Sequence, residues 1–188
     1  MVLTTSELYK RLELKNKEIV LLTSLENYYK DNINFDLLVN IINGNDKISK
    51  RTIEYFVTQY SGKNNIVYTL NNGPNKDQHF NVYNSYKNQL KAYKKKYFDP
   101  FGRGDRIPFF INDDCIITTV GQLNFYKWFF SKEIYNYCFN NYNTIQTSLL
   151  NIKKTSTRKP KTVKVVKPQY SYQSNINNNG RITVSFSL

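Results

Sequence analysis

Positively charged side chains are concentrated between residues 87 and 106, where the sequence reads KNQLKAYKKKYFDPFGRGDR. Lysine and arginine at this density can hold the phosphates of a polyanion, and aromatic rings among them can stack on bases. The candidate phosphate-binding residues of this segment are Lys87, Lys91, Lys94, Lys95, Lys96, Arg103 and Arg106. We predict a nucleic-acid-binding surface here. The alternative is that these cations are only exposed to water on one face of a helix and bind no ligand.

Aromatic residues accompany the lysines at helical spacing. Tyr86, Leu90, Tyr93 and Tyr97 follow one another at i, i+4, i+7 and i+11, which predicts one face of a helix. These rings could form part of the core or offer stacking surfaces for bases. In either case the lysine stripe beside them stays available to phosphates.

A second group of cations lies near the end of the chain. Residues 134–188 carry eight basic side chains and no acidic one, whereas residues 1–133 carry nineteen and fourteen, so the net charges are +8 and +5. The positive charges of this segment repel one another, and it contains Pro160 and Pro168. We therefore predict an extended arm. Its candidate phosphate contacts are Lys153, Lys154, Arg158, Lys159, Lys161, Lys164 and Lys167. The arm could instead be a nuclear address or a solvated tail.

Patterns typical of catalysis are scarce. His79 is the sole histidine, and no nucleophile elbow, Walker A loop or dinucleotide-binding glycine pattern occurs. Aspartates at 99, 105, 113 and 114 could hold Mg²⁺ as in a nuclease, but each is also typical of a turn. We therefore expect no enzyme, no catalytic residue, no metal site and no cofactor, with a metal-dependent nuclease as a minor alternative.

Cysteine usage and hydropathy bear on the compartment. Cys115 and Cys138 lie 23 residues apart without the spacing of a zinc site, which is typical of a reducing environment. No apolar run reaches the roughly 18 residues that a membrane span needs, and Met1 is not followed by a secretory signal pattern. We expect an intracellular protein without a membrane span.

Apolar periodicity predicts helices in the first third of the chain. Thr4 and Glu7 match a capping box before a stripe over residues 8–29, which the lysines at 15–17 could divide. A short stripe over residues 35–42 ends at an Asn-Gly-Asn-Asp turn, and another over residues 53–60 ends at Ser61-Gly62.

Strands and further helices are predicted beyond residue 65. Residues 66–70 and 80–82 are strand candidates, a helix follows from 84 to 97, and 106–111 and 115–118 match a hairpin. Thr119 and Gln122 form a capping box before a helix to about residue 140 that is apolar on most sides and therefore central. A last short helix is predicted around Ile145, Leu149 and Leu150, and a strand is predicted at 181–186.

These elements predict an α+β, mostly helical single domain with a small β-hairpin and a basic extended C-terminal arm. We divide the chain into an N-terminal helical segment at 1–46, a core at 47–152 and the arm with its terminal strand at 153–188.

Two segments resemble a protein family of the nucleocytoplasmic large DNA viruses, or giant viruses, and within it the immediate-early infected-cell proteins of iridoviruses. They are FNVYNSYKNQLKAY at 80–93, leading into Phe-Asp-Pro-Phe at 98–101, and TTVGQLNFYKW at 118–128. RTIEYFVTQY at 51–60 is similar to the upstream segment of that family, so the resemblance covers residues 50–140. The family pattern has Cys-Arg-Arg after the turn, but here Gly-Arg-Gly-Asp follows, which argues against a cysteine function.

The resemblance implies a viral protein of the host cytoplasm, acting in the viral factory or the virion, with the host nucleus also open. Together with the charge, it predicts a non-enzymatic protein that binds DNA or RNA with low sequence specificity in gene expression or genome packaging. The alternative is a structural or scaffold protein whose arm and terminal strand bind an acidic viral protein. The oligomeric state stays open.

Overall fold

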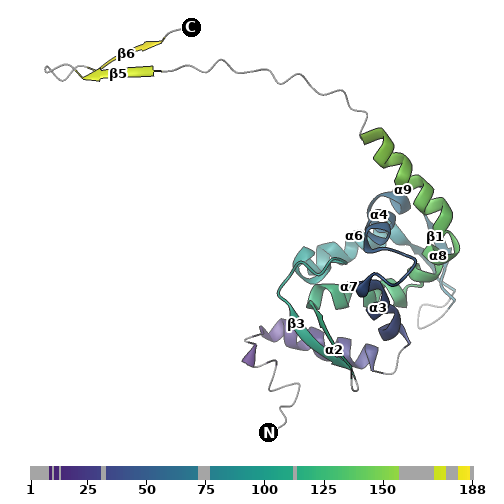
Figure 1. Cartoon of the computed structure of the whole chain (residues 1–188). Coiled ribbons are helices and arrows are strands. Elements are labelled where there is room, and N and C mark those ends of the chain that lie inside the picture. Colours follow the sequence, from purple (N-terminus) through teal and green to yellow (C-terminus); the bar gives the residue numbers. More distant parts are fainter. Residues whose placement is uncertain are drawn as a thin grey trace. The chain divides into compact units, whose positions relative to one another are not determined.

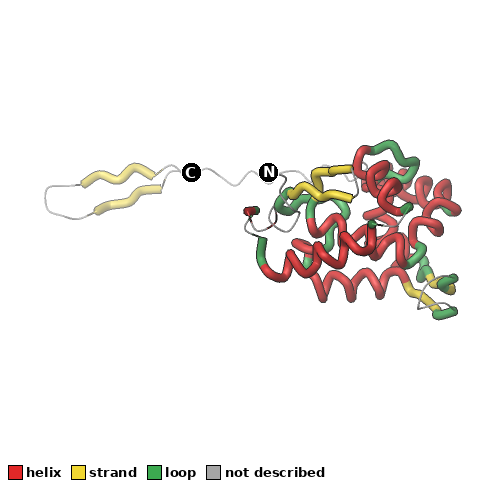
Figure 2. Tube along the Cα trace, turned by 90° about the horizontal axis from the view of Figure 1, so that it is seen from below, coloured by secondary structure: helices red, strands yellow, loops and turns green. Residues whose placement is uncertain are grey.

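The computed structural model describes residues 9, 11–12, 14–30, 33–71, 77–111, 114–156, 172–176 and 182–186, with the backbone alone for 114 and for all residues beyond 152. The chain forms two compact units, Met1–Lys153 and Lys154–Leu188. Helices make up most of the first unit, and its two strand pairs lie at the margins (Figure 2). The predicted mostly helical α+β class is confirmed.

The first helices follow from local capping. α2 (Asn16–Tyr29) begins where the Glu18 carboxylate accepts a hydrogen bond from the Lys15 backbone at 3.0 Å, so the break predicted at 15–17 is confirmed. α3 (Asn34–Asn43) ends at Gly44, whose φ of +80° favours glycine. The capping box predicted at Thr4 and Glu7 lies outside the described residues.

A continuous helical rod follows, formed by α4 (Lys50–Tyr55), the π-helical turn η1 (Phe56–Tyr60) and α5 (Ser61–Lys63). The sequence predicted that Ser61-Gly62 would end this helix, which is wrong. Ser61 is buried and its hydroxyl donates to the Val57 carbonyl, so the helical path continues through it.

Two antiparallel strand pairs belong to this unit. β1 (Val67–Thr69) pairs with β2 (His79–Asn81), and β3 (Ile107–Ile111) pairs with β4 (Asp114–Thr118). Both the strand predicted at 66–70 and the hairpin at 106–118 are confirmed. β3 alternates buried and more exposed residues, as one face of the hairpin covers the core.

The lysine-bearing helix is shorter than predicted. α6 (Val82–Tyr93) begins at Asn81, whose side chain accepts from the Asn84 backbone at 2.9 Å. It ends at Lys94, which has φ +58° and ψ 169°, and a 3₁₀ turn η2 (Lys95–Tyr97) follows. Tyr97 therefore does not continue the face of Tyr86 and Tyr93, which corrects the single helix predicted for 84–97.

The long helix predicted for 119–140 is divided into α7 (Val120–Ser131) and α8 (Ile134–Asn140), followed by α9 (Tyr142–Ser156). Glu133 has φ +56°, and its carboxylate accepts hydrogen bonds from the backbone and side chain of Asn71 at 3.0 and 3.1 Å. The Tyr68 hydroxyl donates to the Lys132 carbonyl at 2.7 Å. These contacts from the β1 region stabilise the break, and no local sequence pattern reveals them.

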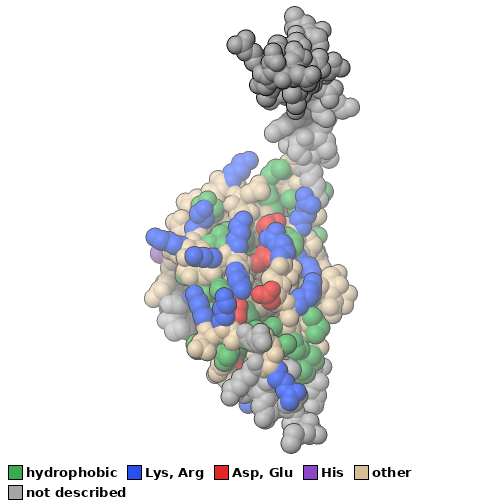
Figure 3. All heavy atoms as spheres, turned by 90° about the vertical axis from the view of Figure 1, so that its left-hand side faces the viewer, with side chains coloured by type: hydrophobic (Ala, Val, Ile, Leu, Met, Phe, Trp, Pro, Cys, Tyr) green, Lys and Arg blue, Asp and Glu red, His purple; other side chains and the backbone are tan. Residues whose placement is uncertain are grey.

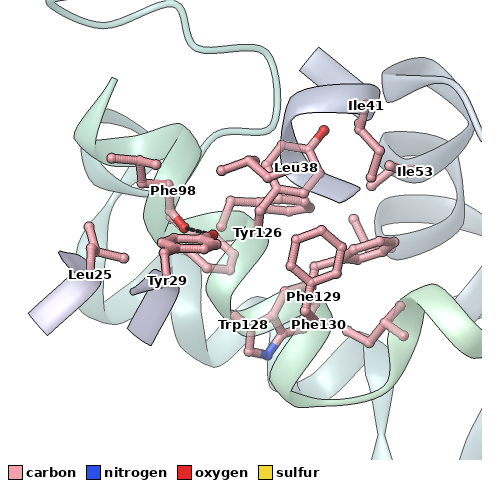
Figure 4. Packing of buried hydrophobic residues seen from close by; sticks show 14 of the residues in the cluster. Leu25, Tyr29, Leu38, Ile41, Ile53, Phe98, Tyr126, Trp128, Phe129 and Phe130 are labelled. Atoms are coloured by element: carbon pink, nitrogen blue, oxygen red, sulfur yellow. Dashed lines mark hydrogen bonds between the residues drawn. The ribbon is translucent and has the colours of Figure 1, made fainter. Parts of the chain in front are cut away.

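α7 is the centre of the first unit, as predicted (Figure 1). Ten of its twelve residues are buried, and the Tyr29 hydroxyl of α2 donates to the Leu123 carbonyl at 3.0 Å. Aromatic rings from α7 pack with Phe98 and Tyr29 (Figure 4). Phe98 lies 5.1 Å from Phe125 and 5.4 Å from Trp128 between ring centroids, so the segment after η2 is anchored in the core.

The second unit contains one strand pair. β5 (Tyr172–Ile176) pairs antiparallel with β6 (Ile182–Phe186), so the strand predicted at 181–186 has a partner strand that the sequence did not predict. Lys153 and Lys154 lie on the helical backbone of α9, because neither glycine nor proline interrupts residues 142–156. The predicted arm is therefore not extended at its start. Arg158, Lys159, Lys161, Lys164 and Lys167 lie outside the described residues.

Within the part of the chain that the structure describes, no helix is both long and apolar enough to cross a membrane.

Candidate nucleic-acid interface

α6 is fixed to the body on two sides. The Trp128 indole N–H donates to the Ser85 hydroxyl at 3.0 Å, which joins α6 to α7. Tyr83 packs on Gly62 of α5 so closely that a Cβ at Gly62 would lie 2.9 Å from the Tyr83 ring. Trp128 is buried in the core and α5 continues the helical rod from α4, so both contacts hold α6 in place and its outer face is firmly supported.

The outer face of α6 is basic and amide-rich. Lys87, Lys91, Asn84 and Asn88 are all exposed, and residues 82–98 contain five lysines and no acidic residue. Their spacing places these four side chains on adjacent stripes of the helix. The face therefore offers ammonium and amide donors without an internal carboxylate.

The loop after η2 carries an ion pair between Arg103 and Asp99. The guanidinium of Arg103 donates to both carboxylate oxygens of Asp99, from Nη2 at 2.7 Å and from Nε at 3.1 Å, and the Arg103 backbone N–H adds a third bond at 3.2 Å. Burial alone would raise the pKa of Asp99, but these bonds outweigh it and hold the pKa below its usual range. Arg103 is thus largely neutralised.

Lys96 takes part in two further ion pairs. Its Nζ lies 3.4 Å from Glu18 Oε1 and 3.4 Å from Asp105 Oδ2. The attraction of Glu18 is the main cause that raises the pKa of Lys96. Burial acts against ionisation of Glu18, but hydrogen bonds from Lys15 and Tyr97 and the charge of Lys96 leave its pKa lowered. Lys96 therefore offers less free charge than its neighbours.

The structure separates the seven predicted contacts of this region into two groups. Arg103 and Lys96 are ion-paired, which corrects the expectation that all seven are available. Five exposed cations have no carboxylate partner among the described residues, namely Lys87, Lys91, Lys94, Lys95 and Arg106. Seen from the left side of Figure 1, where α6 lies, Lys and Arg side chains gather with few acids between them (Figure 3). A depression of about 460 Å³ beside them is lined by Lys95, Lys96, Asp99, Arg103, Gly104 and Asp105.

Residues of α7 hold the basic loop in place. The Gln122 amide donates to the Pro100 carbonyl at 2.8 Å, and the Asn124 amide donates to the Tyr97 carbonyl at 2.9 Å. The Asp99 backbone N–H donates to the Gly121 carbonyl at 3.1 Å. The sequence did not single out these positioning roles. The only sequence signal for these roles was that Gly121, Gln122 and Asn124 lie in the segment 118–128, which forms part of the family resemblance.

The glycines of the loop differ from each other. Gly102 has φ +62°, a left-handed conformation that favours glycine. Gly104 does not have a positive φ.

The tyrosines of α6 belong to the packed side of the helix. Tyr86 and Tyr93 are half-buried and lie 6.1 and 6.4 Å from the Phe98 ring centroid. Of the two interpretations of these rings, core packing is the one that the contacts support.

The carboxylates proposed for a nuclease do not converge among the described residues, where no group of three or more His, Cys, Asp and Glu could hold a metal ion. Asp99 is committed to Arg103, while Asp113 lies outside the described residues and Asp114 is described by backbone alone. The absence of an enzymatic activity stays a prediction.

Comparison with known proteins gives a family. Residues 4–185 match the profile of a family of unknown function (DUF7197). The chain belongs to this family. It is also 34% identical, over 176 residues, to "Uncharacterized protein L507" of Acanthamoeba polyphaga mimivirus; the match covers 90% of this chain and 64% of that protein. The chain thus spans about 64% of the length of this curated relative. No solved structure matches.

The mimivirus relative bears out the prediction of a conserved giant-virus family. The narrower resemblance to the iridovirus infected-cell proteins stays a prediction.

Proposed function

We propose that this protein binds nucleic acid through the α6 surface, defined as Lys87, Lys91, Lys94, Lys95 and Arg106, with little sequence preference. One observation carries the proposal: these five exposed cations have no acidic partner in the described chain and are presented on a helix and loop fixed to the core. Phosphate contacts position a protein on nucleic acid without reading its sequence. Its place of action would be the viral factory or the virion, in gene expression or genome packaging.

Salt-dependent binding tests the proposal. Each phosphate neutralised on duplex DNA contributes about −0.9 to the slope of log K against log salt, so this surface accounts for a slope of about −4.5. We expect Lys87→Gln combined with Lys91→Gln to weaken binding and to reduce the slope by about 1.8.

The matched control changes the same net charge elsewhere. Lys30→Gln combined with Lys47→Gln removes two exposed lysines outside the α6 surface. If both double variants reduce the slope equally, binding follows total charge, and the α6 surface is not the site. If the full chain binds neither DNA nor RNA at low salt, the proposal is wrong.

A scaffold role is the second candidate, favoured by the separate unit that contains β5 and β6. An isolated two-stranded hairpin is at best marginally stable in water, so a partner that pairs with a hairpin edge would stabilise it. Affinity purification of the full chain and of a chain ending at residue 153, with nuclease treatment of both, separates the candidates. A viral protein retained by the full chain alone and resistant to nuclease supports the scaffold role.

A further inference from the structure

We infer that the α6 surface takes the phosphate backbone of an intact duplex and not the unstacked bases of a single strand. The inference rests on the proposed function and specifies its ligand. Proteins that bind single strands combine a basic groove with aromatic rings on which successive bases stack. The availability of ring faces around α6 therefore decides between the two ligand classes.

The aromatic rings bordering the α6 surface already have cationic partners. The ammonium groups of Lys17 and Lys96 lie 5.5 and 5.4 Å from the Tyr97 ring centroid. The guanidinium of Arg103 lies 5.1 Å from the Phe101 centroid while it is held by Asp99. These cation–π contacts occupy positions that a stacked base would need.

The remaining rings are turned toward the protein. Tyr83 packs on Gly62, with Lys87 Nζ 5.9 Å from its centroid, and Tyr86 and Tyr93 pack on Phe98. Large exposed hydrophobic side chains of the described residues include Phe110 and Phe139, but none lies between residues 77 and 106. Among these described rings, the α6 surface thus offers no free stacking platform.

The donors of the surface suit a regular phosphate backbone. Lys87 and Lys91 follow each other on α6 at i and i+4, which corresponds to a step of about 6 Å along the helix axis. Neighbouring phosphates of one strand are separated by distances of the same order. The exposed amides of Asn84 and Asn88 can donate to phosphate oxygens beside them. Donors whose backbone positions are fixed on a helix match the regular phosphate spacing of a duplex better than the variable spacing of a single strand.

The test uses the full chain with a short DNA duplex, the corresponding RNA duplex and the separated strands of each. We expect each duplex to bind at least about fivefold more tightly than its strands, because stacking energy is missing for the latter. Lys87→Gln combined with Lys91→Gln should weaken duplex binding. Phe101→Leu should leave binding of the strands unchanged, while circular dichroism checks that the variant is folded.

The outcomes distinguish the inference from the function on which it rests. Strands that bind as tightly as the duplex, with an affinity that falls in Phe101→Leu, overturn the inference and leave nucleic-acid binding standing. Absence of binding to every probe overturns the proposed function and the inference with it. A preference for the RNA or the DNA duplex identifies the source of the phosphate backbone.

Discussion

Gly121 and Lys96 approach each other so closely that a Cβ at Gly121 would lie 2.6 Å from the Lys96 carbonyl oxygen. The neighbouring atom belongs to the backbone and cannot rotate away. The contact joins the first turn of α7 to η2, and it holds the backbone at Lys94 and Lys95 in place.

Gly121→Ala should destabilise the protein by about 1–3 kcal/mol, because the added methyl group forces a backbone shift in a packed region. Urea unfolding measures the change. Gly104→Ala is the matched control, since its Cβ would meet nothing closer than 3.8 Å. Equal costs for the two variants would contradict the structural role given to Gly121.

Gly102→Ala should cost more than Gly44→Ala, by about 1 kcal/mol. Both glycines have positive φ, of +62° and +80°, so both substitutions introduce backbone strain. Only at Gly102 would the Cβ also collide, at 2.7 Å from Gln122 Oε1, whereas nothing lies within 4 Å at Gly44. The difference in unfolding free energy between the two variants measures the cost of the collision with Gln122. If Gly44→Ala is destabilised as much as Gly102→Ala, the collision has no such cost.

The sequence predicted the elements whose cause is local. The turn at Gly44, the hairpin at 106–118 and the burial of α7 each depend on neighbouring residues, and each is found in the structure. The break at Glu133 depends on Asn71, which lies 62 residues away, and no pattern of helix periodicity contains that contact.

The candidate site was predicted by charge density but not by charge pairing. All seven cations of the segment were identified, yet Lys96 is held by Glu18, which lies far from it in the sequence. A net charge sums over side chains without placing them. For the same reason, the cation–π contacts from which we infer a duplex ligand became visible only in the structure.

Arg103→Gln should destabilise the protein by about 1–3 kcal/mol near neutral pH, because the buried carboxylate of Asp99 loses its bidentate partner. The pKa of Asp99 is lowered in the folded wild type, so its contribution is present above the unfolded pKa of about 3.9 and is lost as pH falls through the folded pKa. The cost of the substitution should therefore shrink toward about pH 3.

Unfolding free energies at both pH values check this expectation. Arg106→Gln removes an exposed arginine that forms no ion pair with the residues that the structure describes, and it should change stability by less than about 0.5 kcal/mol at either pH. A cost for Arg103→Gln that stays constant between the two conditions would mean that its contacts with Phe101 matter more than the pairing with Asp99.

Lys94→Gly should stabilise the protein by about 1 kcal/mol and weaken nucleic-acid binding at the same time. Lys94 has φ +58° and ψ 169°, a conformation that is nearly confined to glycine. Glycine relieves the strain, but it removes one cation of the α6 surface. The thermal midpoint and the salt slope are measured on the same variant. Lys95→Gly, at a residue without positive φ, should weaken binding without any gain in stability.

Asp105→Asn should tighten nucleic-acid binding by about two- to fivefold, corresponding to about 0.4–1 kcal/mol. The Asp105 side chain is 85% exposed and its Oδ2 lies 3.4 Å from Lys96 Nζ. Its negative charge therefore repels phosphate and also offsets the positive charge of Lys96. The amide removes both effects, and because the wild-type pair is exposed and screened, the fold should change little in stability. Asp36→Asn, at an exposed position on α3, makes the same change in net charge outside the α6 surface. If Asp36→Asn tightens binding as much as Asp105→Asn does, the effect comes from net charge, and phosphate does not bind beside Lys96.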